Sequence, residues 1–277
     1  MKILHRALAA LAAAAALAMP AYATTYSVDY TDLWYNPNES GWGLNLIQQG
    51  QTMFGTLFVY GVGTTAQWFV ASDIEPVGTS TTQFSGQLFQ TSGPYFAAPG
   101  FDPNQVRPVT VGTIGLTFTD ANTAILIYTV NGQQVTKTVT RQTWRNDNLS
   151  GTYIGGLTAI GSSCNPSDYA GAILIFGELT AAQSSNNQVT MNVQFTSSAN
   201  QASQCTYQGP YTQAGRSGSI SGTYACNING QSANAGSFTV SRIQSSLDGF
   251  MGHFNGQDQY CASYDGQFGG VLDVPLP

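Results

Sequence analysis

Two carboxylates beside tryptophan side chains are the residues of this chain best suited to chemistry. In the stretch DLWYNPNESGWG, residues 32–43, Asp32 and Glu39 lie on either side of Trp34, and Trp42 follows. A pair of carboxylates can hydrolyse a glycosidic bond. An apolar neighbourhood would raise the pKa of Glu39 toward the value that a general acid needs. One hypothesis is therefore a glycosidase-like extracellular hydrolase that uses Glu39 with Asp32.

The same stretch also fits a structural turn or a binding site. Asn36 before Pro37 predicts a turn, in which the Glu39 carboxylate would accept hydrogen bonds from backbone N–H groups. Aromatic side chains usually form core, but rings gathered at a barrel mouth can hold a ligand. The main hypothesis is a non-catalytic binding or interaction protein, with the hydrolase as the alternative. The candidate ligand contacts are Trp34, Asn36, Glu39, Trp42 and Trp68.

Other catalytic and metal chemistries lack the residues that they need. After residue 23 the only histidine is His253, and the sequence contains no Gly-x-Ser-x-Gly, which argues against a serine hydrolase. We expect His253 to be a half-exposed strand residue. A zinc site would need a tighter group of cysteines and histidines, so we predict no metal site and no cofactor.

The first 23 residues, MKILHRALAALAAAAALAMPAYA, are typical of a secretory signal peptide. A basic start, an apolar run and a small-x-small site predict cleavage after Ala23 and a secreted or periplasmic protein. With Lys2 and Arg6 removed, the eight basic residues fall to six against fourteen acidic ones, a net charge of −8. No basic run is available for phosphate groups, so we expect no binding to nucleic acid or to anionic lipid surfaces.

Four cysteines in an exported chain predict two disulfides. The stretch CTYQGPYTQAGRSGSISGTYAC, residues 205–226, predicts one hairpin folded near Gly215-Arg216. In that register Cys205 faces Cys226 and Tyr207 faces Tyr224. A Cys205–Cys226 bridge would leave Cys164 to pair with Cys261, although four cysteines permit three pairings.

Tryptophan and cysteine divide the chain into two halves. All four tryptophans precede residue 145, all four cysteines follow residue 163, and the polar stretch RNDNLSG, residues 145–151, predicts a linker. We therefore expect a signal peptide of residues 1–23, a Trp-rich domain of residues 24–145 and a disulfide-containing domain of residues 149–277.

Both halves are predicted to be all-β, as antiparallel meanders that form small barrels or sandwiches. Residues 53–60 are apolar on both strand faces, which predicts a strand covered on both sides. Trp68 has the parity of Ala66 and Val70 and is expected in the core, and Trp144 is expected to end the last strand of its domain. Asn131-Gly132 predicts a type I′ turn.

The second half contains about eight strand candidates, which suggests a small closed barrel. They begin near residues 149, 170, 188, 204, 218, 235, 247 and 267. An outer-membrane barrel is the competing architecture, but its strands need about ten residues with an apolar outer band. Many of the expected strands are shorter, and those of the second half are rich in Gly and Ser, so we expect no membrane span.

The Trp-rich half resembles a domain that recurs in exported proteins of proteobacteria. The shared pattern is Trp-x-Asn-Pro-x-Glu-Ser-Gly-Trp-Gly followed by a Gln-Gln-Gly turn and an aromatic strand. The stretches that carry it are residues 33–60, 66–72, 92–106, 111–118 and 135–144. GTYAC and GQFGGV in the second half are similar to a domain that accompanies it.

The resemblance implies an exported β-protein and no particular activity. The strand pattern is also loosely similar to avidin-like and lipocalin-like barrels, which is an analogy of fold alone. The expected partner is a small apolar or glycan ligand or a protein surface, and an oligomer is compatible with the sequence.

Overall fold

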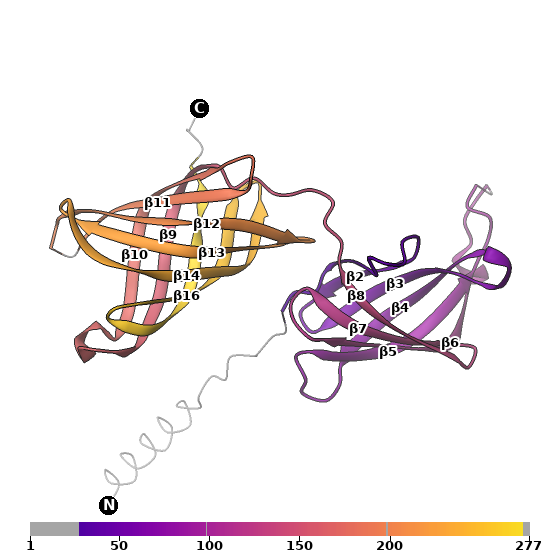
Figure 1. Ribbon diagram of the computed structural model, residues 1–277. Helices are drawn as coiled ribbons and strands as arrows, with labels where there is room; N and C mark the ends of the chain where they lie inside the picture. Colours follow the sequence, from indigo (N-terminus) through magenta and orange to yellow (C-terminus); the bar gives the residue numbers. More distant parts are fainter. Residues whose placement is uncertain (1–27, 98, 198, 274–277) are drawn as a thin grey trace, which may run out of the picture.

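Two closed antiparallel barrels of eight strands each make up the part of the protein that the structure describes (Figure 1). The computed structural model describes residues 28–97, 99–197 and 199–273. This architecture confirms the predicted all-β fold of two antiparallel domains, both of which are barrels rather than sandwiches. The predicted signal peptide, residues 1–23, lies outside the described residues. Within the described ranges, no helix is long and apolar enough to cross a membrane.

Barrel 1 is a meander in which each strand pairs with the next along the chain. Its strands are β1 (Asp32–Tyr35), β2 (Gly43–Gln49), β3 (Thr52–Tyr60), β4 (Ala66–Pro76), β5 (Gln83–Ser92), β6 (Arg107–Phe118), β7 (Thr123–Val130) and β8 (Gln133–Arg141). Two 3-10 helices lie in its loops, η1 (Val62–Thr64) and η2 (Pro103–Gln105). The β7–β8 turn has positive φ at both Asn131 and Gly132, which is the geometry of the predicted type I′ turn.

Barrel 2 repeats the meander, and β9 pairs with both β10 and β16 to close it. Its strands are β9 (Gly151–Cys164), β10 (Gly171–Gln183), β11 (Gln188–Thr196), β12 (Ala202–Ala214), β13 (Ser217–Ile228), β14 (Gln231–Ser246), β15 (Gly249–Asp258) and β16 (Cys261–Leu272), with η3 (Ser167–Tyr169) after β9. Eight strands enclose an interior that side chains can fill. Here that interior is filled by aromatic rings, with Tyr207 against Phe238, Phe254 and Phe268.

The strand alternation in barrel 1 sends one set of side chains inward and leaves an aromatic set outside. Met53 and Leu57 of β3 are fully buried, whereas Phe54 and Phe58 are exposed on the outer wall. The expectation that β3 is covered on both sides was therefore wrong. Trp68 pairs with Phe58 across β3 and β4 and is 51% exposed, so the expected core position was also wrong.

The seam of barrel 1 is short and is reinforced by a buried ion pair. The described β1–β8 ladder pairs Trp34 with Arg141 and Tyr35 with Thr140. The Arg141 guanidinium donates to the Asp32 carboxylate at 2.9 Å and also to the backbone carbonyls of Asp29, Thr31 and Ala121. Each guanidinium nitrogen thus has an acceptor, which burial of this charge requires. Trp144, which was expected to end the last strand, follows β8 in the connection to barrel 2 and is largely exposed.

Both predicted disulfides are present. Cys205 pairs with Cys226 across β12 and β13, and Tyr207 lies opposite Tyr224, as the predicted hairpin register requires. Cys164 pairs with Cys261 across β9 and β16, the two strands that close the barrel.

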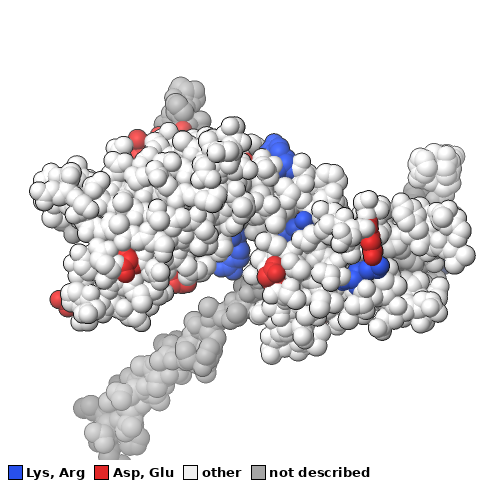
Figure 2. Space-filling model, viewed as in Figure 1, with Lys and Arg blue, Asp and Glu red and all other residues white. Residues whose placement is uncertain are grey.

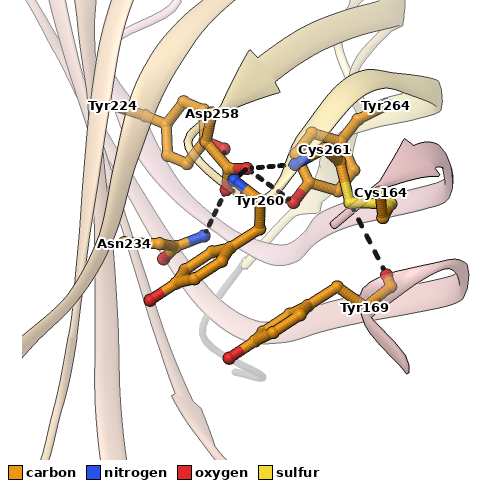
Figure 3. Close-up of a disulfide and its surroundings, with 8 residues drawn as sticks. All are labelled: Cys164, Tyr169, Tyr224, Asn234, Asp258, Tyr260, Cys261 and Tyr264. Carbon is orange, nitrogen blue, oxygen red and sulfur yellow. Dashed lines mark hydrogen bonds between the residues drawn. A yellow bond between two sulfur atoms is a disulfide. The ribbon is translucent and has the colours of Figure 1, made fainter. Parts of the chain in front are cut away.

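A partly buried carboxylate fixes the end of barrel 2 beside the Cys164–Cys261 disulfide (Figure 3). Asp258 accepts from the hydroxyls of Tyr224 and Tyr264 at 3.0 Å, and from the side-chain amide of Asn234. It also accepts from the backbone N–H groups of Tyr260 and Cys261. Burial raises the pKa of Asp258, but these hydrogen bonds to the ionised form outweigh it and hold the pKa below its usual value. This end of the barrel is therefore closed by a satisfied polar network.

The opposite end of barrel 2 meets barrel 1. The tip of the β12–β13 hairpin, at Gly215 and Arg216, contacts Asp32 at the start of β1 and Arg141 at the end of β8. The Arg216 backbone N–H donates to the Asp32 carboxylate at 2.7 Å, and the Gly215 N–H donates to the Thr143 hydroxyl at 2.9 Å. We call this contact the joint. Figure 2 shows basic side chains, with acidic ones among them, where the two barrels meet on an otherwise sparsely charged surface.

Candidate functional site

Three of the predicted site residues meet in the turn at the far end of barrel 1. The Asn36 carbonyl accepts from the Glu39 N–H at 3.0 Å, and the Asn36 side chain accepts from the Asn38 N–H at 2.9 Å. The Glu39 carboxylate accepts from the indole N–H of Trp42 at 3.1 Å and from the Lys137 ammonium at 2.9 Å. The turn therefore fastens β1–β2 to the inward-facing Lys137 of β8.

Glu39 is held in its charged form at this barrel mouth. The hydrogen bond from Lys137 is the largest cause, and with the Trp42 indole it lowers the pKa of Glu39 despite partial desolvation. A general acid for glycoside cleavage needs a raised pKa. The environment of Glu39 thus acts against the acid role and favours the structural one.

The other carboxylate of the hydrolase hypothesis is engaged elsewhere. Asp32 lies in the joint, where Arg141 and the Arg216 N–H occupy it. Glu39 lies beyond the opposite end of β1, at the mouth that Lys137 covers. The structure does not bring the two acids together in an open cleft, which is the arrangement that the hydrolase hypothesis needs.

The predicted tryptophan contacts divide among three environments. Trp34 is fully buried, donates from its indole N–H to the Tyr30 carbonyl at 3.0 Å and packs its ring edge-on against Phe118. Trp42 packs partly buried against the core at the barrel mouth. Of the three, only Trp68 is on the outer wall, where it lies opposite the exposed Phe58 of β3, with the exposed Tyr60 two residues farther along that strand. These residues do not form one pocket.

A groove lies on the outer wall of barrel 2. Strand pairing sets Phe176, Gly156, Gly269, Met251 and Gln244 side by side across β10, β9, β16, β15 and β14. All five line the groove, whose volume is about 570 Å³. The two glycines lie between the side chains of Phe176 and Met251. We call this cavity the glycine-floored groove.

Glycine is required at the floor because neighbouring strands come too close for a side chain. A Cβ added to Gly156 would lie 2.0 Å from the carbonyl oxygen of Ile175. A Cβ added to Gly269 would lie 2.2 Å from the carbonyl oxygen of Phe250. Close backbone approach of this kind is a common reason for glycine within strands. As a result no side chain rises between the two apolar walls.

The walls of the groove are apolar and its rim is polar. Phe176 and Met251 flank the two glycines, and Ile154 pairs with Val271 two residues farther along β9 and β16. All four side chains are between 46% and 65% exposed and so form an apolar patch on the outer wall. The polar residues along the groove include Thr158, Arg216, Gln244, Ser246, Asp248 and Gln267. Apolar walls with a few polar groups are typical of small-molecule sites, and the volume is in the usual range.

His253 lies beyond the groove on β15. Its imidazole Nε2 is 3.2 Å from the Asp265 carboxylate, and its side chain is 23% exposed. Within the described ranges, no group of three His, Cys, Asp or Glu residues is arranged to hold a metal ion.

The groove residues escaped the sequence analysis, although two signals for them were present. The run AILIF, residues 172–176, is apolar on both strand faces, and the barrel interior uses only one of them. The pairs Gly155-Gly156 and Gly269-Gly270 interrupt two strands at positions that lie opposite each other. Neither signal identifies the groove without the pairing of β9 with β16.

Comparisons with known proteins give no relative for this chain, since no family model, curated protein or solved structure matches it. The resemblance to exported proteobacterial proteins remains a prediction.

Proposed function

We propose that this is an exported, non-catalytic binding protein and that the glycine-floored groove holds a small apolar ligand. The observation that carries the proposal is the glycine floor between exposed apolar walls, with a volume of about 570 Å³. A ligand seated there would cover Phe176, Met251, Ile154 and Val271. Removing such surface from water is favourable by roughly 25 cal/mol per Å².

The residues along the groove support binding rather than catalysis. They include one carboxylate, Asp248, and neither histidine nor cysteine. Hydrolytic mechanisms need a nucleophile with its base, or two acids placed on either side of the substrate. Export is supported by the two disulfides, which suit a non-reducing compartment.

Displacement of a neutral fluorescent probe tests the proposal. We expect 1-aminoanthracene to bind the protein and dodecanol to displace it. Met251→Glu puts a charge on one wall and should weaken dodecanol binding at least tenfold, because burying an unpaired charge is costly. Ile127→Glu is the matched control, since Ile127 is a partly exposed apolar residue on the outer wall of barrel 1.

Two results would count against the groove as the ligand site. One is the absence of any saturable probe binding. The other is equal loss of dodecanol binding in Met251→Glu and Ile127→Glu. Circular dichroism of both variants shows whether the barrels remain folded, so that a folding defect is not mistaken for a binding defect.

A second candidate function is glycan binding on the aromatic wall of barrel 1. The side chains of Phe58 and Trp68 lie opposite each other on adjacent strands, and Tyr60 lies farther along β3. Titration of tryptophan fluorescence with soluble oligosaccharides should give a saturable change that Trp68→Ala abolishes and Trp144→Ala retains. No change with any sugar, or a change in sedimentation with Trp68→Ala, would favour a protein partner on this wall.

A further inference from the structure

The end of the glycine-floored groove that lies nearest barrel 1 opens on the joint. Arg216 and Gln244 line the groove and also line two smaller cavities between the barrels, of about 170 Å³ and about 220 Å³. The groove and the joint are therefore connected through the same two residues. A ligand in the groove would have one end at the meeting point of the two barrels.

Basic side chains concentrate at that meeting point. The cavity of about 170 Å³ is lined by Arg141, Arg216 and Arg242, together with Asp29. Arg141 is buried and fully engaged by Asp32 and by backbone carbonyls. Arg216 and Arg242 are exposed, and no ion pair or hydrogen bond to either guanidinium occurs among the described residues.

The carboxylates near the joint either accept hydrogen bonds from other groups or lie at the edge of the groove. Asp29 accepts from the Thr31 N–H at 2.9 Å. Asp147 accepts from the Ser245 hydroxyl at 2.6 Å and lies 3.8 Å from the exposed Arg145 guanidinium. Asp248, exposed in the turn before β15, is the acid on the groove itself. No carboxylate among the described residues therefore pairs with the guanidinium groups of Arg216 and Arg242, and both can bind an anionic ligand.

The backbone fixes where these two arginines project. The Arg216 N–H is bonded to Asp32, so the side chain starts from a position anchored on barrel 1. Arg242 lies in the bulge between Ser241 and Gln244 on β14, with φ of +54°. Bulges of this kind redirect a side chain from its strand. The Arg242 charge is close enough to barrel 1 to act on Tyr30, whose pKa is raised mainly by burial and lowered in part by Arg141 and Arg242.

We propose that the ligand is an amphipathic anion, with a single acyl chain in the glycine-floored groove and a carboxylate or phosphate headgroup on Arg216 and Arg242 in the joint. This inference rests on the proposed function. The apolar walls recognise the chain, and the two guanidinium groups recognise the headgroup through charge-assisted hydrogen bonds. The ligand would contact the residues that dock barrel 2 on barrel 1.

Three probes with the same chain length test this assignment on the purified protein. Laurate and dodecyl phosphate carry the anion, dodecanol lacks it, and each competes with 1-aminoanthracene. We expect laurate or dodecyl phosphate to bind at least tenfold more tightly than dodecanol. The preferred headgroup distinguishes a carboxylate from a phosphate ligand. Raising the salt concentration should weaken binding of laurate and dodecyl phosphate and leave binding of dodecanol unchanged.

Neutral variants locate the headgroup. Arg216→Gln and Arg242→Gln should each bring the affinity for the preferred anion toward that of dodecanol, with dodecanol binding unchanged. Arg216→Gln keeps the backbone N–H that binds Asp32, so the joint is retained. Arg107→Gln is the control, because Arg107 is exposed on barrel 1 and bonds only to nearby backbone carbonyls.

The outcomes separate this inference from the proposed function. Equal affinity for all three probes, unaffected by Arg216→Gln, would overturn the headgroup assignment and leave the apolar groove intact. A preference for anions that Arg107→Gln removes and Arg216→Gln retains would also overturn it. Failure of every probe to displace 1-aminoanthracene would overturn the proposed function itself.

Discussion

The backbone N–H of Arg216 donates to the carboxylate of Asp32 at 2.7 Å, although 184 residues separate the two in the chain. Asp32 also pairs with Arg141 across the β1–β8 seam. One carboxylate therefore closes the first barrel and receives the hairpin tip of the second. Closure of barrel 1 and docking of barrel 2 depend on the same buried group.

Gly215→Ala should detach the two barrels. The new Cβ would lie 2.1 Å from Asp32 Oδ2 and 2.9 Å from Arg141 Cβ, and φ is +58°. We expect the joint to lose about 2–4 kcal/mol from the clash and the backbone strain together. Limited proteolysis of the connection at residues 142–150 and small-angle scattering should show a more accessible connection and a larger radius of gyration.

Gly230→Ala is the matched control for that substitution. Gly230 also has positive φ, at +75°, but nothing lies within 4 Å of its added Cβ. It should cost only the strain of about 1–2 kcal/mol and leave the joint closed. Equal proteolysis of the two variants would mean that the hairpin tip does not hold the barrels together.

Asp32→Ala should destabilise barrel 1 by about 3–5 kcal/mol, because it leaves the buried Arg141 charge without its partner. The tryptophans report on this directly, since Trp34, Trp42 and Trp68 lie in barrel 1 and barrel 2 has none. Urea unfolding followed by tryptophan emission should show the midpoint fall. Asp73→Ala, at an exposed position on β4, should stay within about 0.5 kcal/mol of the parent. Similar midpoints for both variants would argue against a stabilising role for the ion pair.

The sequence was sufficient for features that depend on local pairing. Placing the turn at Gly215-Arg216 sets the parity of the flanking strands, and the positions of Cys205 and Cys226 then follow. The Asn131-Gly132 turn is likewise a local property, because few residue pairs tolerate two positive φ angles.

Features that depend on which face is inside were not predictable in the same way. The alternation of side chains along β4 puts Trp68 on the same face as Ala66 and Val70. Both faces of the neighbouring β3 are apolar, so this alternation does not show which face lies inside the barrel. Prediction of the glycine-floored groove also requires knowledge of barrel closure, since Gly156 and Gly269 meet only when the last strand of barrel 2 pairs with its first. Such a site depends on barrel closure, which no local pattern encodes.

Removal of the two disulfides should have unequal effects on barrel 2. Cys164 and Cys261 are 97 residues apart, and Cys205 and Cys226 are 21 apart. The chain-entropy model predicts losses of about 5 and about 3 kcal/mol for the paired Cys→Ser variants. Denaturant unfolding followed by far-ultraviolet circular dichroism measures both. A larger loss for the Cys205–Cys226 variant would show that packing of the fully buried Cys205 outweighs loop closure.

Glu39→Gln should lower the stability of barrel 1 near neutral pH and have less effect in acid. The pKa of Glu39 in the folded protein is below its ordinary value of 4.5, mainly because Lys137 donates to it. Its ion pair therefore stabilises the fold fully above about pH 4.5 and loses that contribution as the pH falls through the lower, folded pKa. Urea midpoints of parent and variant, followed by tryptophan emission, should converge as the pH is lowered from 7 to 3. Since the Glu39–Lys137 pair is partly exposed, added salt should also narrow the difference between the urea midpoints at pH 7.

Glu75→Gln, at an exposed position on β4, is the control and should match the urea midpoint of the parent at every pH and salt concentration. A difference for Glu39→Gln that stays constant with pH and salt would assign the stabilisation to packing of the turn against Trp42 rather than to the charge of Glu39.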